Sequence, residues 1–120
     1  MGYYTNFQLD MVDAKTHESI YSDSMIYLAV QEAFGKINDY IDFDGLIDGS
    51  AESYKWYDWR TQMLQLAREF PSIHFTLSGE GEDREDNWIA DFIDNRFAVR
   101  RAEIVYPELK DAEWVEVEVE

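Results

Sequence analysis

The sequence predicts an α+β domain: a mainly antiparallel sheet of four to six strands with two helices packed on one face. Hydrophobic residues make up 46% of the 120 residues, which is enough to build a core. Several short segments alternate apolar and polar residues, as half-buried strands do, whereas two longer segments repeat apolar residues at helical spacing. A chain of this length fits one domain, so we expect residues 1–120 to fold as a unit.

The first strand and the first helix are expected in residues 3–40. Residues 3–12 alternate apolar and polar side chains, which indicates a half-buried strand. Residues 24–40 predict a helix, which Ser22 or Asp23 can cap. Its apolar stripe consists of Ile26, Val30, Phe34 and Ile37. Residues 39–52 carry five acids, no base and two glycines, so they predict a loop with room for a short turn of helix.

A second helix is expected in the middle of the chain. Residues 53–57 are typical of a short strand, and Asp58 follows at a position suited to an N-cap. Pro71 ends the helix, because proline lacks the amide hydrogen that a helix interior requires. The apolar stripe of this helix consists of Met63, Leu66, Ala67 and Phe70.

Three more strands are expected, over residues 73–78, 88–93 and 97–106, the last of them ended by Pro107. Asp94 and Asn95 tolerate a positive φ and predict a two-residue hairpin turn. The alternation slips near Arg100-Arg101, which predicts a β-bulge. A tight turn opposes three pairs of residues: Phe92 and Phe97, Ala90 and Val99, and Trp88 and Arg101.

The C-terminal residues 108–120 leave two alternatives open. Their last part, EWVEVEVE, alternates valine with glutamate, which predicts an acidic edge strand whose carboxylates discourage aggregation. Chain ends also fray often, so a frayed tail is the other alternative.

The balance of charge is the strongest compositional signal. The 26 Asp and Glu against 10 Lys and Arg give a net charge of −16, spread over both halves of the chain. Such a charge repels nucleic acid and anionic membranes, and it accelerates encounter with basic protein surfaces. The absence of cysteine excludes disulfides and thiolate chemistry. No stretch has the pattern of a signal peptide or membrane span, so we expect a cytoplasmic location, in the host cell if a phage encodes the chain.

Four short motifs between residues 53 and 107 carry a resemblance to a known group of proteins. They are YKWYD at residues 54–58, Phe70-Pro71, GEGE at residues 79–82, and Trp88 followed by Phe92. In these motifs the chain resembles a family of small, uncharacterised bacterial and prophage proteins. The resemblance implies a ferredoxin-like α+β fold and a phage or prophage setting, and it implies no activity.

The acidic segments do not match a known metal or catalytic motif. The loop at residues 80–86 lacks the ligand alternation and the central glycine of an EF-hand, and residues 44–55 place a leucine and a lysine in ligand positions. The two histidines, His17 and His74, are expected on the surface, and no serine lies in a nucleophile elbow. We therefore expect no catalytic residue, no metal, no cofactor and no enzymatic activity.

The leading hypothesis is a phage-associated acidic inhibitor. Carboxylates on a rigid scaffold can imitate a nucleic-acid backbone and occupy the basic groove of a host defence protein of the CRISPR or restriction type. In size and charge the chain is similar to phage anti-defence DNA mimics, including anti-CRISPR and anti-restriction proteins. The expected partner-binding residues are Glu80, Glu82, Asp83, Glu85 and Asp86 in one loop, Asp39, Asp42, Asp44 and Asp48 in another, Glu116, Glu118 and Glu120 at the C-terminus, and the aromatic pair Trp56 and Tyr57.

Two alternatives to this hypothesis remain. The first is a non-enzymatic interaction or assembly module that uses its aromatic patch and its sheet edge, as a monomer or a homodimer. The second is a small metal-dependent enzyme. The partner under the leading hypothesis is a basic protein surface, with no direct binding to nucleic acid or membrane.

Overall fold

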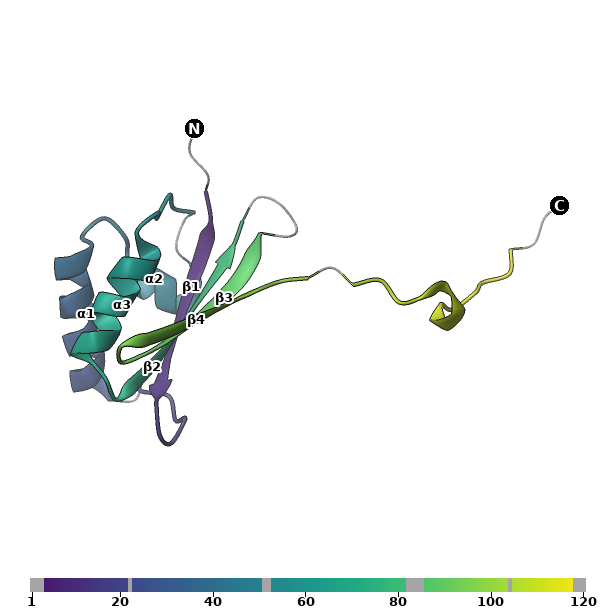
Figure 1. Cartoon of the computed structure of the whole chain (residues 1–120). Helices are drawn as coiled ribbons and strands as arrows, with labels where there is room; N and C mark the ends of the chain where they lie inside the picture. The colour runs from purple at the N-terminus through teal and green to yellow at the C-terminus, as the bar shows by residue number, and fades with distance from the viewer. Residues whose placement is uncertain (1–3, 22, 51–52, 82–85, 104, 118–120) are drawn as a thin grey trace.

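The computed structural model covers the chain and describes residues 4–21, 23–50, 53–81, 86–103 and 105–117 (Figure 1). Four antiparallel strands form one sheet in the order β1-β2-β3-β4. The strands are β1 (Asn6–Asp13), β2 (Ile73–Glu80), β3 (Asn87–Ile93) and β4 (Arg96–Arg101). The helices are α1 (Ser24–Ile37), α2 (Phe43–Asp48) and α3 (Trp59–Glu69), and a 3-10 turn, η1 (Leu109–Asp111), follows β4.

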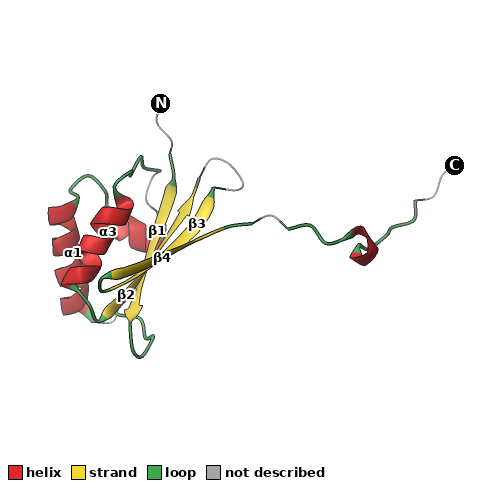
Figure 2. Ribbon diagram, viewed as in Figure 1, coloured by secondary structure: helices red, strands yellow, loops and turns green. Residues whose placement is uncertain are grey.

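All three helices lie between β1 and β2 in the chain, and they form a layer beside the sheet (Figure 2). α2 contacts β1, α3 contacts β2 and β3, and α1 packs on α2 and α3. The predicted α+β class with an antiparallel sheet is confirmed, with four strands and three helices. A ferredoxin-like fold alternates its elements as β-α-β-β-α-β. That part of the prediction is not confirmed, because no helix separates β3 from β4.

The core forms where alternate strand residues meet the apolar stripes of the helices. The register opposes Met11 to Phe75 and Phe75 to Phe92, and all three side chains are fully buried. From the helices, Val30, Phe34, Leu46, Met63 and Leu66 fill the other half of the core. The apolar residues that recur every second position in the strands and every three to four positions in the helices therefore pack into one core.

The predicted ends of the helices are largely confirmed. The Asp23 carboxylate accepts hydrogen bonds from the backbone N–H groups of Met25 and Ile26, both at 3.2 Å, so Asp23 is the N-cap of α1. α1 ends at Ile37, three residues before the predicted end, because the Asn38 side chain accepts from the next backbone N–H groups and turns the chain. α3 ends at Glu69, just before Phe70-Pro71, as predicted.

Two predicted strands differ from the structure. Residues 53–57 form no strand; Tyr54 makes a single bridge to Thr5. β4 ends at Arg101 without the predicted bulge, and residues 102–103 and 105–106 are not part of the sheet. The neighbouring strand β3 begins at Asn87, whose carbonyl accepts the backbone N–H of Ala102 at 2.8 Å, and β3 offers no further partners. A pattern of alternation cannot become a strand where the neighbouring strand has ended.

The hairpin between β3 and β4 matches the prediction. Asp94 adopts a positive φ of 53°, and all three predicted residue pairs are opposed. The Arg68 guanidinium donates to the Asn95 side chain at 2.7 Å, which ties the end of α3 to this turn.

The described residues after β4 extend away from the sheet (Figure 1). Apart from η1 they have no regular structure, and residues 113–117 pair with no strand among the described residues. The predicted edge strand is therefore absent for residues 113–117, while residues 118–120 lie outside the described residues. Among the described helices, none has the length and apolar character that crossing a membrane requires.

Candidate functional site

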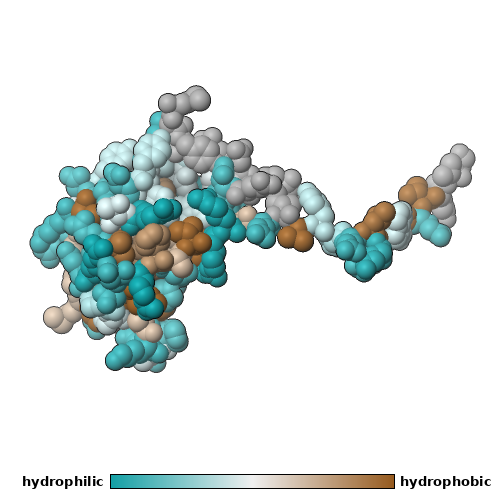
Figure 3. Space-filling view, in the orientation of Figure 1, coloured by the Kyte–Doolittle hydropathy of each residue, from teal (hydrophilic) through white to brown (hydrophobic). Residues whose placement is uncertain are grey.

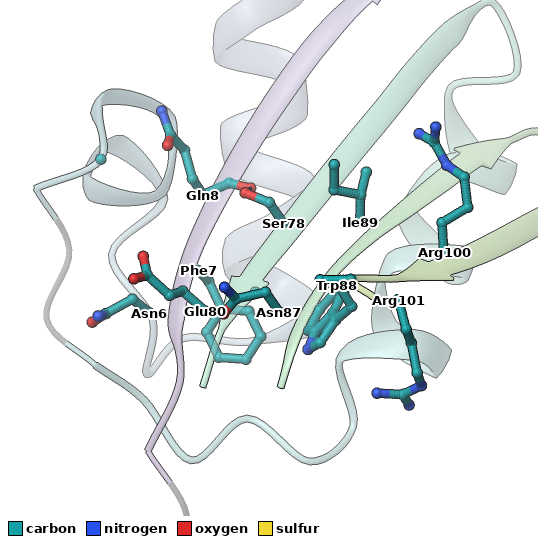
Figure 4. A pocket seen from close by; sticks show the side chains of 13 residues that line it. Asn6, Phe7, Gln8, Ser78, Glu80, Asn87, Trp88, Ile89, Arg100 and Arg101 are labelled. Carbon is teal, nitrogen blue, oxygen red and sulfur yellow. Dashed lines mark hydrogen bonds between the residues drawn. The ribbon is translucent and has the colours of Figure 1, made fainter. Parts of the chain in front are cut away.

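A polar groove of about 630 Å³ lies where one end of the sheet meets the end of α2 (Figure 4). All four strands contribute to it, since β1 and β3 begin there and β2 and β4 end there. Its lining consists of Asn6, Phe7, Gln8, Gly49, Ser78, Gly79, Glu80, Asn87, Trp88, Ile89, Arg100, Arg101 and Ala102.

The indole of Trp88 forms the rigid base of the groove. It stacks on Trp59 at 4.2 Å between ring centroids and meets Phe7 edge-on at 5.9 Å. The ring covers Gly79 so closely that a Cβ atom at this position would overlap it. Position 79 therefore requires a glycine because the indole approaches the backbone so closely. The reason is not conformational, since Gly79 lies in a strand and has no positive φ.

The walls of the groove combine amide groups with charges of both signs. Glu80 lies on the β2 side, and Arg100 and Arg101 lie on the β4 side (Figure 4). The Asn87 Oδ1 atom is buried and has no hydrogen-bond partner among the described residues. A partner that donates a hydrogen bond into the groove would satisfy this acceptor, as buried polar atoms generally require.

The acids of α2 are held by specific hydrogen bonds. Asp44 accepts from the Tyr27 hydroxyl at 2.6 Å and from the Gln31 amide at 3.0 Å. Burial and this bond to a carboxylate raise the pKa of Tyr27 to about 12. Asp48 accepts from the hydroxyl and the backbone N–H of Ser50, which lowers the pKa of its carboxyl. These hydrogen bonds hold both carboxylates in defined orientations.

The structure brings part of two predicted acidic groups to the same end of the sheet. Gly49 follows Asp48, adopts a φ of 79° and lies against the Gln8 side chain, so the end of α2 reaches the groove that Glu80 lines. The Asp86 carbonyl accepts from the Gly81 backbone N–H at 3.1 Å, which closes the β2–β3 connection beside Glu80.

The other predicted acids divide into three sets. Asp39 and Asp42 precede α2, and the Asp42 backbone N–H donates to the Tyr54 hydroxyl at 3.3 Å. Glu116 lies on the extended C-terminal segment, away from the sheet and from the groove that Glu80 lines (Figure 1). Glu82, Asp83, Glu85, Glu118 and Glu120 lie outside the described residues.

The two predicted aromatic residues have different environments. Trp56 is only 6% exposed, its ring meets Phe7 and Phe34 edge-on, and its indole N–H donates to Gln62 at 2.6 Å. It is a core residue, which corrects the prediction that it contacts a partner. Tyr57 is exposed.

Sequence reasoning missed a polar network on the open face of the sheet. Asp91 accepts from His74 at 2.8 Å, from the Thr76 hydroxyl at 2.9 Å and from Arg100 at 2.9 Å. Burial raises the pKa of Asp91, but these three hydrogen bonds outweigh burial and leave the pKa below its usual value. In the sequence, all four residues of this network lie at polar positions of their strands. This feature indicates a network only when the strand register, which brings them together, is known.

The described residues contain no group of three or more His, Asp or Glu side chains that could hold a metal ion.

No family model, curated protein or solved structure matches the chain. The resemblance to small bacterial and prophage proteins therefore stays a prediction.

Proposed function

We propose that this protein is a non-enzymatic, acidic binding protein that occupies the basic nucleic-acid-binding surface of another protein. The proposed contact surface is the acidic end, defined here as Asp44, Asp48, Glu80 and Asp86. The phage setting, a host defence protein as the target and a cytoplasmic location belong to the same proposal, and they rest on the sequence alone.

One observation carries this proposal: Gly49, which directly follows α2, and Glu80, at the end of β2, are far apart in the sequence but line the same groove. The backbone beside these acids is held in place, since Gly49 lies against Gln8 of β1 and the Gly81 N–H donates to the Asp86 carbonyl beside Glu80. Carboxylates held in fixed positions bind a cationic surface without losing much side-chain freedom. Ion pairing and release of counterions from the partner then favour binding, as they favour binding of nucleic acid to the same surface.

The charges around the groove restrict the side from which a cationic partner can approach. Arg100 and Arg101 line the β4 side of the groove, so a cationic partner approaches from the side of β1 and α2. On the open face, the Asp91 carboxylate already pairs with Arg100 and is hydrogen-bonded to His74. The C-terminal segment is not required for this binding mode.

The test is capture of proteins from a bacterial lysate on immobilised protein, followed by competition. We expect a captured basic protein to be released by raised salt and by duplex DNA or RNA in excess. The triple variant Asp48→Asn, Glu80→Gln, Asp86→Asn should weaken binding by about tenfold or more. Captured proteins that nucleic acid does not displace would contradict the proposal.

A second triple variant provides the matched control. Glu32→Gln, Glu69→Gln and Glu108→Gln remove the same number of charges from exposed positions outside the acidic end. This control should bind like the unmodified protein. Equal weakening by both variants would mean that total charge alone determines binding, which would also contradict the proposal. Thermal unfolding of each variant verifies that the fold is intact.

A further inference from the structure

The two edges of the sheet differ in how they are covered. Along β1, Tyr54 and Ser19 form bridges with Thr5 and Val12, and the Tyr21 hydroxyl accepts the Met11 backbone N–H at 3.0 Å. In the described part of the chain, β4 has no strand or bridge on its outer side. Unpaired backbone groups along such an edge are a template for another strand.

The C-terminal segment, defined here as residues 105–117, exposes an unusual number of large apolar side chains. Trp114 is 75% exposed, and Val115 and Val117 are each 80% exposed. Val105, Tyr106 and Leu109 are exposed as well. Figure 3 shows these hydrophobic residues spread along the extended segment, among hydrophilic ones. A segment that stays in water usually lacks such residues, so their presence indicates a surface that covers them.

We infer that residues 113–117 of one copy add as a fifth strand to the β4 edge of a second copy. This inference goes beyond the proposed function and does not depend on it, because it uses none of the residues of the acidic end.

The side chains of the two strands are complementary on one face. An antiparallel register that opposes Val115 to Val99 also opposes Val117 to Phe97, whose ring is 43% exposed in the single chain. On this side of the sheet Val99 packs against the core, so the added valines extend the core past its present edge. The same register opposes Glu113 to Arg101, an ion pair between directly facing residues.

The other face is complementary in the same register. Trp114 lies opposite Arg100, which allows a cation–π contact, and Glu116 lies opposite Ala98. A shift by one residue would place Glu116 beside the apolar Val99 or Phe97, so the period of two selects the register.

The direction of the chain identifies a second copy as the occupant. Residues after Arg101 continue away from their own sheet and do not fold back in the described part of the chain (Figure 1). The connection of residues 102–112 spans up to about 36 Å when extended, which is enough to reach a neighbouring sheet. When two copies exchange these segments, the β4 edge of each copy is covered. The assembly then closes as a two-fold dimer.

The first experiment is light scattering with size-exclusion chromatography on the full chain at about 0.15 M salt, where long-range repulsion between the acidic copies is screened. We expect a mass of about twice 14.2 kDa. Deletion of residues 113–120 should give a monomer. A monomeric full chain, or a deletion that leaves the dimer intact, would overturn the inference.

Charge exchange between copies provides a stringent test that keeps the full chain. Arg101→Glu and Glu113→Arg should each raise the dimer dissociation constant by about tenfold, because two contacts per dimer become repulsive. An equimolar mixture of the two variants should restore dimerisation, since each interface then pairs opposite or native charges. Failure of the mixture to dimerise better than either variant would overturn the inference.

Hydrogen exchange distinguishes pairing between copies from pairing within one copy. In the dimer, the amides of Val115 and Val117, which face the outward backbone carbonyls of Val99 and Phe97, should be protected, and dilution should remove the protection. Protection in a monomer would show that the segment folds back onto its own β4, which contradicts exchange between copies. The matched control Glu108→Gln removes a charge from the connection and should leave dimerisation unchanged.

Discussion

The two faces of the sheet are built from adjacent residues of the same strands, yet they have opposite roles. On the face toward the helices, Phe75 lies between Met11 and Phe92, and these three side chains are fully buried. On the open face, the next residue, Thr76, belongs to the hydrogen-bond network of Asp91. Successive residues of β2 therefore alternate between side chains that pack in the core and side chains that form polar contacts on the open face.

The two faces therefore contribute differently to the stability of the fold. The buried face excludes water and tolerates little change of volume, because packed interiors have few voids. The open face is partly solvated, so its hydrogen bonds and ion pairs contribute less to stability. Substitutions placed at matched positions on the two faces measure the difference directly.

The largest effect is expected for Phe75→Ala. The ring is fully buried at the centre of the sheet, and its removal leaves a cavity that neighbouring side chains fill only partly. We expect the free energy of unfolding to fall by about 3–5 kcal/mol. Thr76→Ala, one residue away on the open face, should cost about 1 kcal/mol through one lost hydrogen bond. Urea denaturation of both variants gives the comparison, and equal losses would contradict the assignment of the two faces.

A smaller loss is expected where the backbone of β2 contacts an aromatic ring. In Gly79→Ala the new Cβ overlaps the Trp88 indole, which is fixed by its stacking on Trp59. We expect a loss of about 1–3 kcal/mol from overpacking. Gly35→Ala is the matched control, because Gly35 is exposed on α1 and has no atom within 4 Å of the added Cβ. The control should stabilise the protein by about 0.5–1 kcal/mol. Thermal unfolding that shows both substitutions to be neutral would mean that the indole moves aside.

The buried face could be predicted from the sequence because burial leaves a periodic pattern. The alternation in β1, β2 and β3, the apolar stripe of α3 and the register across the Asp94 turn are local signals that the structure confirms. The stripe of α1 is confirmed at Val30, Phe34 and Ile37, whereas Ile26 is exposed. Long-range partners were not predictable in this way. Residues 102–106 alternate as a strand does, but the sequence does not show that β3 begins at Asn87 and offers them no partner.

The candidate site was predicted only in part for the same reason. The sequence located the acids, but it could not show that the end of α2 and Glu80 line one groove, since this depends on how α2 packs on β1. Trp56 was assigned to a partner surface because Trp and Tyr favour the centres of interfaces, whereas three-dimensional packing places its ring against Phe7 and Phe34. The network of Asp91 combines residues from three strands, which no local motif reveals.

A loss well below that of Phe75→Ala, and the one with a pH signature, is expected for Asp91→Asn on the open face. The amide keeps the shape of the carboxylate but loses the charge that His74 and Arg100 face, so we expect a loss of about 1–2 kcal/mol at neutral pH. The pKa of Asp91 is lower in the folded protein than in the unfolded chain, so its carboxylate stabilises the fold at pH values above the unfolded pKa. This contribution is lost as the pH falls through the folded pKa. The difference in stability between the two proteins should therefore shrink below about pH 4, where unfolded aspartate becomes protonated. Denaturation curves between neutral and acidic pH measure this change. A difference that stays constant over that range would show that the charge of Asp91 does not stabilise the open face.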